Sequence, residues 1–275
     1  MENKIIASTG TFIGRANGAD YTLIPRIYEQ LDCDGIELLF MQVWNGRLEK
    51  IAEEVKSYGI NTYSVHLDKS IGVLFSEGTD KDDLEALKLF ENNIYSAGLT
   101  GAKIAVLHLW GGPKSDGKID RTKKLLSQMY KMSKEQGITL TIENIPCVFS
   151  DPLSVWKILQ EEYNDVVFTF DTRFADFHNQ YIDIFKSDMW SHVVHAHVSS
   201  YNGQKNNIGF IRPILHYDEG AIDFEHLFSN MPGYKGAVAL ESPALREDGW
   251  IDVSRLNKSL NYIRNSLKKY NIYNK

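Results

Sequence analysis

Residues 103–109 read KIAVLHL and residues 138–144 read ITLTIEN, and the segment between them carries Leu125 and Met129 at helical spacing. The IAVL segment of the first run (104–107) is continuously apolar, which is typical of a strand buried on both faces of a parallel sheet. Gly137 stands just before the second run, where a helix is expected to end on a left-handed residue. This stretch therefore predicts a strand–helix–strand unit with parallel strands.

The same order repeats along the whole chain, and Gly59 and Gly98 are expected to end two further helices. Short apolar or β-branched runs occur at residues 4–9, 35–40, 62–67, 103–109, 138–144, 166–171, 192–198 and 236–241. Eight units in 275 residues favour a closed barrel, because this fold commonly uses about 250 residues as one domain. We therefore predict an α/β fold, a single-domain (β/α)8 TIM barrel over residues 1–275. No GxGxxG follows the first strand to support a dinucleotide-binding sheet.

The composition excludes several classes of protein. Apolar residues make up 43% of the chain, with 13 Phe, 14 Tyr and 5 Trp, which excludes a disordered chain. The net charge of −6 argues against a nucleic-acid partner. No apolar run reaches the ~20 residues of a membrane span, and the first ten residues lack a signal-peptide pattern. We therefore predict a cytoplasmic protein without a membrane partner, in which Cys33 and Cys147 are buried thiols.

Polar side chains stand where most of the predicted strands end. In chain order these residues are Glu37, His66, His108, Glu143 with Asn144, Asp171, His195 with His197, and Glu241. The carboxyl ends of barrel strands meet at one mouth of the fold. A buried carboxylate or imidazole is costly unless it is paired or bound to a cation. The set Glu143, Asp171, His197 and Glu241 therefore predicts a divalent metal site, with a hydrogen-bonded polar plug as the alternative.

Short motifs in this order resemble the xylose-isomerase-like TIM barrel superfamily. They are IEN (142–144), FD (170–171), HAHVSS (195–200), EGAIDF (219–224) and LESPA (240–244). This superfamily includes ketose 3-epimerases, inosose dehydratases, other sugar isomerases and the endonuclease IV group. The resemblance covers nearly the whole chain and implies a metal-dependent isomerase or epimerase of carbohydrate metabolism with a small-molecule carbohydrate substrate.

The resemblance also implies the roles of the strand-end residues. Glu143, Asp171, His197 and Glu241 take the positions of the metal ligands, and Glu143 and Glu241 are also the catalytic acid/base pair. Three carboxylates and one imidazole suit a fairly hard ion, so Mn²⁺ is expected first, with Mg²⁺, Co²⁺ or Zn²⁺ as alternatives. A cation would stabilise the enediolate that forms when a proton leaves the carbon beside a ketone. Inversion of that carbon needs one carboxylate on each face.

Further residues are predicted to contact the substrate, namely His66, His108, Trp110 and His216. Trp110 follows the fourth strand, where its ring is expected to stack on a sugar. Two other interpretations of His66 and His108 stay open, as ligands of a second metal with Glu143 or as hydrogen-bonded core histidines. A surface position is the alternative for His216. Lys69, Lys114 and Arg173 are candidate contacts for an anion, and no separate cofactor-binding motif is present.

Alternative functions follow from the same residues. The endonuclease IV group has additional histidines on the third and fourth strands, so a dinuclear-metal hydrolase is an alternative. Its third metal site needs a His where Phe174 stands and an Asp-x-His that residues 211–220 lack. A keto-inositol dehydratase would use nearly the same residues for β-elimination, and a metal–sugar sensor is the non-enzymatic alternative. A homo-oligomer is left open, and His178 and His195 receive no assigned role.

Overall fold

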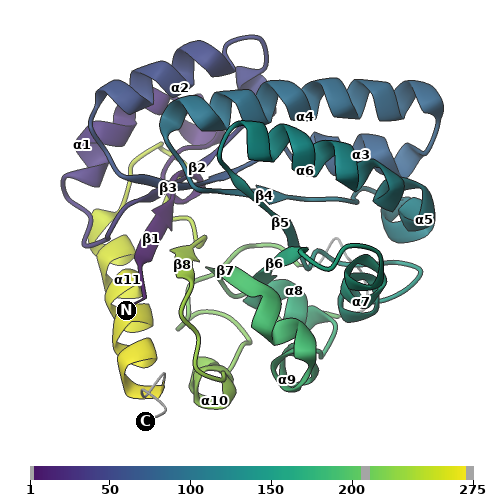
Figure 1. Ribbon diagram of the computed structural model, residues 1–275. Helices are drawn as coiled ribbons and strands as arrows, with labels where there is room; N and C mark the ends of the chain where they lie inside the picture. The colour runs from purple at the N-terminus through teal and green to yellow at the C-terminus, as the bar shows by residue number, and fades with distance from the viewer. Residues whose placement is uncertain (1–2, 206–210, 271–275) are drawn as a thin grey trace. The chain divides into compact units, whose positions relative to one another are not determined.

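Eight short strands alternate with helices in the computed structural model, which describes residues 3–205 and 211–270 (Figure 1). The strands are β1 (Ile5–Ser8), β2 (Ile36–Leu39), β3 (Thr62–His66), β4 (Ile104–Leu107), β5 (Thr139–Glu143), β6 (Val167–Asp171), β7 (Val193–Val198) and β8 (Ala237–Leu240). They form a closed barrel in chain order, from β1 to β8 and back to β1. The predicted (β/α)8 TIM barrel is confirmed.

Helices follow the strands as the apolar spacing predicts. They are α1 (Ile24–Tyr28), α2 (Leu48–Ser57), α3 (Ser70–Glu77), α4 (Asp80–Thr100), α5 (Ile119–Thr122), α6 (Leu126–Glu135), α7 (Pro152–Glu162), α8 (Thr172–Phe177), α9 (Tyr181–Lys186), α10 (Phe224–Asn230) and α11 (Val253–Tyr270). Gly59 and Gly137 have positive φ after α2 and α6, as expected. The prediction for Gly98 was wrong, because α4 continues to Thr100 and ends on Gly101, whose φ is 83°.

The chain divides into two compact units. Unit 1 comprises Met1–Ile36 and Thr169–Lys275, and unit 2 comprises Glu37–Phe168. The single-domain organisation over residues 1–275 stays a prediction.

In unit 2, β4 pairs in parallel with β3 and β5, with Ala105 opposite both Val65 and Leu140. All three side chains are buried, as expected for strands covered on both faces. Helix α4 packs against α2, α3 and α6 (Figure 1). Its first turn carries three aspartates, and the Thr79 side chain caps it by accepting from the Asp82 backbone N–H.

Helix α3 of unit 2 comes unusually close to the segment that follows β4. A Cβ atom built on Gly72 would lie 2.4 Å from the carbonyl oxygen of His108 and 2.5 Å from that of Trp110. Real Cβ atoms do not approach backbone atoms this closely, so this contact requires glycine. The close packing fixes the backbone from which the His108 side chain projects.

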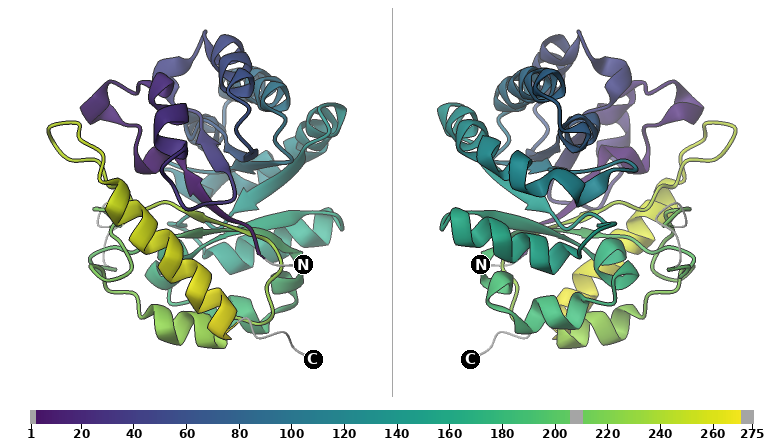
Figure 2. Two further views of the ribbon diagram at one scale, coloured as in Figure 1. Left: turned by 90° about the vertical axis from the view of Figure 1, so that its left-hand side faces the viewer. Right: turned by 90° about the vertical axis from the view of Figure 1, so that its right-hand side faces the viewer.

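In unit 1, β8 pairs in parallel with β7 and β1, which places Ala239 opposite both His197 and Ile6. Helix α11 packs against β1 and α10 (Figures 1 and 2). Leu256, Leu260 and Ile263 on α11 are almost fully buried, so one apolar face of this helix covers the unit. The β7–β8 pairing places the strand that carries His197 beside the strand that Glu241 directly follows.

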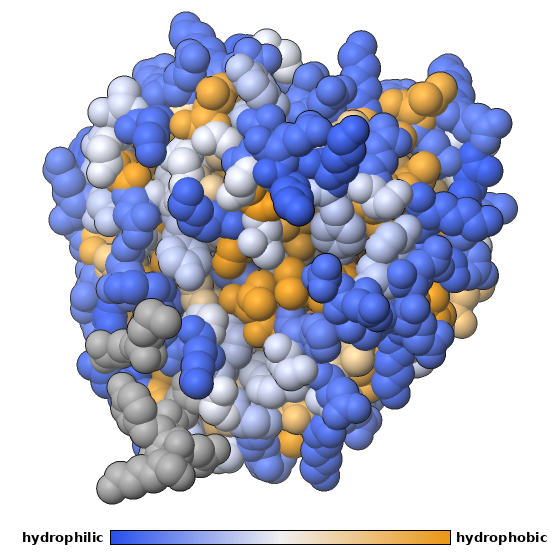
Figure 3. Space-filling model, in the orientation of Figure 1, coloured by the Kyte–Doolittle hydropathy of each residue, from blue (hydrophilic) through white to orange (hydrophobic). Residues whose placement is uncertain are grey.

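The face shown in Figure 3 is mostly hydrophilic, with apolar side chains in scattered groups. Large apolar side chains that are exposed within the described ranges include Val148 and Phe149, at 50% and 71%. None of the described helices combines the length and apolarity needed to cross a membrane. Neither cysteine forms a disulfide within the described residues; Cys147 is buried as predicted, whereas Cys33 is only partly buried.

Candidate metal centre

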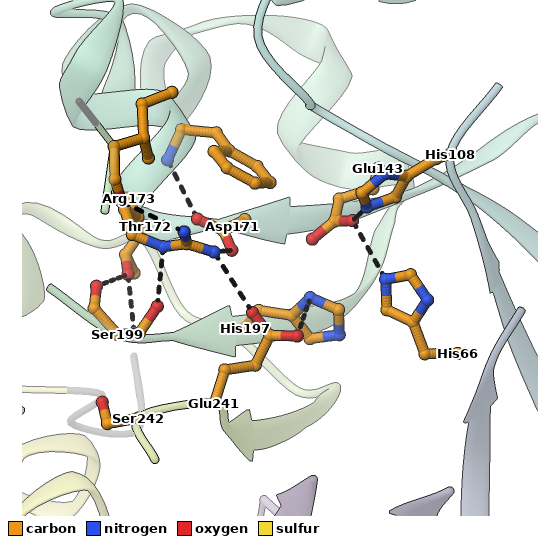
Figure 4. Close-up of polar contacts among 12 residues, drawn as sticks. His66, His108, Glu143, Asp171, Thr172, Arg173, His197, Ser199, Glu241 and Ser242 are labelled. Atoms are coloured by element: carbon orange, nitrogen blue, oxygen red, sulfur yellow. Dashed lines mark hydrogen bonds and ion pairs between the residues drawn. The ribbon is translucent and has the colours of Figure 1, made fainter. Parts of the chain in front are cut away.

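Unit 2 brings together two imidazoles and a carboxylate from the ends of three neighbouring strands. His66 ends β3, His108 follows β4 and Glu143 ends β5. Glu143 Oε2 lies 3.4 Å from His66 Nε2 and 2.5 Å from His108 Nε2 (Figure 4). One ligand atom from each of the three lies within 4.8 Å of the others. Three strand ends that are far apart in the sequence therefore place their polar groups side by side.

The protonation of the two histidines follows from their partners. His66 Nδ1 lies 2.8 Å from the Leu67 carbonyl oxygen, which only accepts, so Nδ1 carries a hydrogen and donates it. Burial lowers the pKa of His108 to about 4, although the Glu143 carboxylate opposes this shift. His108 is therefore neutral at neutral pH. Its Nε2 atom is the ring nitrogen that faces Glu143 Oε2.

Glu37 on β2 is fully buried in the same unit. Its Oε2 accepts a hydrogen bond of 2.9 Å from the Ser64 hydroxyl on β3. This is a pairing with a neighbouring strand of the kind that a buried carboxylate requires.

Unit 1 gathers the other proposed ligands. Asp171 ends β6, His197 lies in β7 and Glu241 directly follows β8. Glu241 Oε1 lies 3.5 Å from His197 Nδ1, and one ligand atom from each of the three lies within 4.8 Å of the others. Asp171 and His197 are fully buried, and the Glu241 side chain is 9% exposed. Two carboxylates and an imidazole so close together and so deeply buried are a set that suits a divalent cation.

Asp171 also begins helix α8. Its Oδ1 accepts a 2.9 Å hydrogen bond from the backbone N–H of Phe174, the capping interaction of a helix N-terminus. This bond fixes the rotation of the carboxylate, so that Oδ2 faces the guanidinium of Arg173 (Figure 4).

Arg173 lies beside Asp171 and Glu241, although it was not among the metal ligands expected from the sequence. Its Nη2 lies 3.4 Å from Asp171 Oδ2 and 3.6 Å from Glu241 Oε2. The sequence indicates it only as a candidate anion contact. Its position two residues after a strand-ending aspartate was the available signal, but the partners that bury it lie far away in the sequence.

The remaining predicted residues have protein partners. Trp110 is 1% exposed, and its indole N–H donates to the Pro146 carbonyl oxygen. His216 Nδ1 lies 2.7 Å from the Ser259 hydroxyl, and Nε2 lies 3.2 Å from the carbonyl oxygen of Pro243. Burial lowers the pKa of His216. Contacts of Trp110 and His216 with a substrate stay predictions.

Two histidines without an assigned role pack against aromatic rings. The His195 ring meets the His197 ring edge-on in β7, with 5.1 Å between centroids. His178 makes the same kind of contact with Phe177.

Comparison with known proteins gives matches to a family model and to solved structures. The model described as xylose isomerase-like TIM barrel matches residues 25–265. No curated protein sequence matches the chain.

Several matching structures are similar to this chain over nearly their whole length. One is an IOLI protein with a bound zinc atom (16% identity, TM-score 0.71, 97% of this chain and 99% of that chain). A second is a D-allulose 3-epimerase from Methylomonas sp. in complex with D-allulose (13% identity, TM-score 0.69, 96% of this chain and 97% of that chain). A third is a D-tagatose 3-epimerase-like protein (16% identity, TM-score 0.66, 95% of this chain and 98% of that chain). At these identities the likeness establishes the fold alone.

Proposed function

The chain belongs to the xylose isomerase-like TIM barrel family, and from this premise we propose that it is a divalent-metal-dependent epimerase or isomerase of a small carbohydrate. The observation that carries the proposal is the buried group of Asp171, His197 and Glu241, whose ligand atoms lie within 4.8 Å of one another. Proteins of similar fold were solved with a zinc atom and with D-allulose, which supports the choice of a metal and a sugar.

We assign Glu143, Asp171, His197 and Glu241 as the metal ligands. They stand at the carboxyl ends of β5, β6, β7 and β8, which are consecutive strands of the barrel. Their donors are three carboxylates and one imidazole, which fit a fairly hard divalent ion, so Mn²⁺ is the expected metal and Zn²⁺ the main alternative. Such an ion would supply positive charge beside the substrate's carbonyl oxygen.

The protein's own part in the reaction is proton transfer. Glu143 and Glu241 are proposed to exchange a proton with the carbon beside the carbonyl, one on each face, which inverts that carbon through an enediolate. The Nε2 atoms of His108 and His66 both lie close to Glu143 Oε2, at 2.5 and 3.4 Å. These contacts orient the carboxylate. The His108 side chain is 11% exposed, so His108 is the histidine of the pair that a substrate could contact.

An exchange experiment tests this proposal. With Mn²⁺ and a panel of ketoses in deuterated water, the wild-type protein should place solvent deuterium on the inverted carbon. Glu143→Gln and Glu241→Gln should each lower the rate about a hundredfold or more, because the amide cannot accept the proton.

Glu91→Gln is the matched control, because Glu91 is an exposed residue of α4 and its loss should leave the rate unchanged. Near-normal exchange in both active-site variants would remove the two glutamates from proton transfer. Metal-dependent sugar binding without any exchange across the panel would favour a sensor instead.

A second candidate is a dinuclear-metal hydrolase, which the His66, His108 and Glu143 group favours because it could hold an ion of its own. Elemental analysis after Mn²⁺ or Zn²⁺ loading separates the two candidates. One ion per chain supports the epimerase, whereas two ions together with metal-dependent nicking of apurinic-site DNA support the hydrolase. A single ion with no nicking removes the hydrolase from consideration.

A further inference from the structure

We propose that Arg173 is a built-in cation that shares two of the proposed metal ligands and thereby weakens the binding of a divalent ion. The inference rests on the proposed metal function of Asp171 and Glu241. Its starting point is the position of Nη2, which lies 3.4 Å from Asp171 Oδ2 and 3.6 Å from Glu241 Oε2 (Figure 4). One guanidinium nitrogen therefore faces a carboxylate oxygen of each residue.

The guanidinium is held in this position by groups other than the carboxylates. Its Nε donates to the Ser199 hydroxyl at 3.1 Å and its Nη1 donates to the Ile211 carbonyl oxygen at 3.4 Å. The Cζ atom lies 4.6 Å from the centre of the Phe174 ring, within the range of a cation–π contact. The residue is 4% exposed. These contacts fix a charge that arginine cannot lose by deprotonation.

Ser199, which receives the Nε–H, is itself fixed by Thr172. The Thr172 hydroxyl donates to the Ser199 carbonyl oxygen at 2.8 Å and lies 3.2 Å from the Ser199 backbone nitrogen. Asp171, Thr172 and Arg173 are consecutive, so a single short segment supplies a proposed ligand, its support and the neighbouring cation. Arg173 is thus a positioning residue for the ligands and competes with the metal for them.

The charges predict how this arrangement acts. Without a metal, the guanidinium offsets the repulsion between the carboxylates of Asp171 and Glu241 and keeps them in place. When a divalent ion binds to the same oxygens, two cations lie within a few ångströms of each other in a buried site, where repulsion is strong. Arg173 therefore stabilises the metal-free protein and lowers its affinity for the metal.

Metal titration of three proteins tests the proposal. Chelator-stripped wild type, Arg173→Gln and Arg173→Lys are titrated calorimetrically with Mn²⁺ alone, with chelator competition where binding is tight. Arg173→Gln should bind Mn²⁺ about tenfold or more tightly than wild type, because the repelling charge is gone. Arg173→Lys keeps that charge but loses the Nε and Nη1 contacts, so its Mn²⁺ affinity should lie between those of wild type and Arg173→Gln.

The matched control is Arg255→Gln. Arg255 is also in unit 1 and pairs with Asp218 and Glu219, so this change removes the same charge elsewhere and should leave the Mn²⁺ affinity unchanged. A purely structural role of Arg173 predicts that Arg173→Gln binds Mn²⁺ equally or more weakly, and that result overturns the proposal. If wild type and variants all fail to bind, the proposed metal function itself has failed.

A measurement on the wild type covers the case in which Arg173→Gln does not fold. The Nε–H resonance of Arg173, identified by its loss in Arg173→Lys, should move when the diamagnetic ion Zn²⁺ saturates the protein. An unmoved resonance in protein shown to hold zinc would overturn the proposal.

Discussion

At the scale of single residues, the strand-end carboxylates and imidazoles could be found in the sequence, but their supporting partners could not. Glu143 and Asp171 stand out because a charged side chain ends an otherwise apolar run. Arg173 does not stand out, since its burial depends on Ser199 and Ile211, which are 26 and 38 residues away. A contact formed by such distant residues leaves no local pattern to read.

His216 offers a residue-scale prediction about pH. Its folded-state pKa is lowered, first by burial and then by Arg255, with Glu219 and Asp218 acting in the opposite direction. The unfolded chain therefore binds a proton more readily, so the stability that neutral His216 contributes is complete above its ordinary pKa of about 6.5 and is lost as the pH falls below it.

Urea unfolding of wild type and His216→Gln measures this effect. At pH 8 the wild type should be more stable by about 1–2 kcal/mol, because the variant loses two buried hydrogen bonds. At pH 5 that difference should be smaller, since only the wild type has an imidazole at position 216 to protonate. A difference that stays constant or grows toward pH 5 would contradict the assignment.

At the scale of elements, strands and helices followed from apolar spacing, whereas the end of α4 did not. Gly98 looked like a helix end because it precedes a strand, yet α4 continues to Thr100 and ends on Gly101. From the local sequence alone, either Gly98 or Gly101 could end the helix. The packing of α4 against α6 cannot be read from that sequence. The close approach of α3 to the backbone after β4 was likewise hidden, since Gly72 is an ordinary helical position in the sequence.

Gly72→Ala tests the importance of that approach. The added methyl would meet the carbonyl oxygens of His108 and Trp110 at 2.4 and 2.5 Å, so α3 must move away. We expect a loss of about 1–3 kcal/mol in the free energy of unfolding and, under the proposed function, slower turnover as His108 shifts.

The matched control is Gly98→Ala, another helical glycine of unit 2. Its added methyl would meet mainly the flexible Gln136 side chain, and alanine favours the helix by up to about 1 kcal/mol. Chemical denaturation should therefore show this variant to be as stable as wild type or more so. Equal stability of the two alanine variants would show that the α3 contact adapts easily.

At the scale of the whole molecule, the barrel itself was predictable because eight repeats of the same local pattern leave few other arrangements. The division into two units was not predicted. Among the proposed ligands, Glu143 belongs to unit 2, and Asp171, His197 and Glu241 belong to unit 1.

Metal loading should therefore stabilise the chain as a whole. Mn²⁺ at about a hundred times its Kd contributes about 2.7 kcal/mol, which should raise the Tm of the metal-free protein by about 5 °C or more. Calorimetry before and after chelation measures the shift. Glu143→Gln should lose most of the gain, and an unchanged Tm in wild type would contradict a metal shared by these residues.

The contact at Gly72 also bears on how this protein could be engineered. Because the carbonyl groups of His108 and Trp110 lie against Gly72, α3 leaves no room to enlarge or reshape the segment that holds His108. In the loop after β5, the side chains of Val148 and Phe149 are exposed, while their backbone N–H groups donate to Asp116 Oδ1, so the side chains can change without altering these backbone contacts. Libraries of variants aimed at new substrates should therefore diversify side chains in the loop after β5 and keep the segment that holds His108 unchanged.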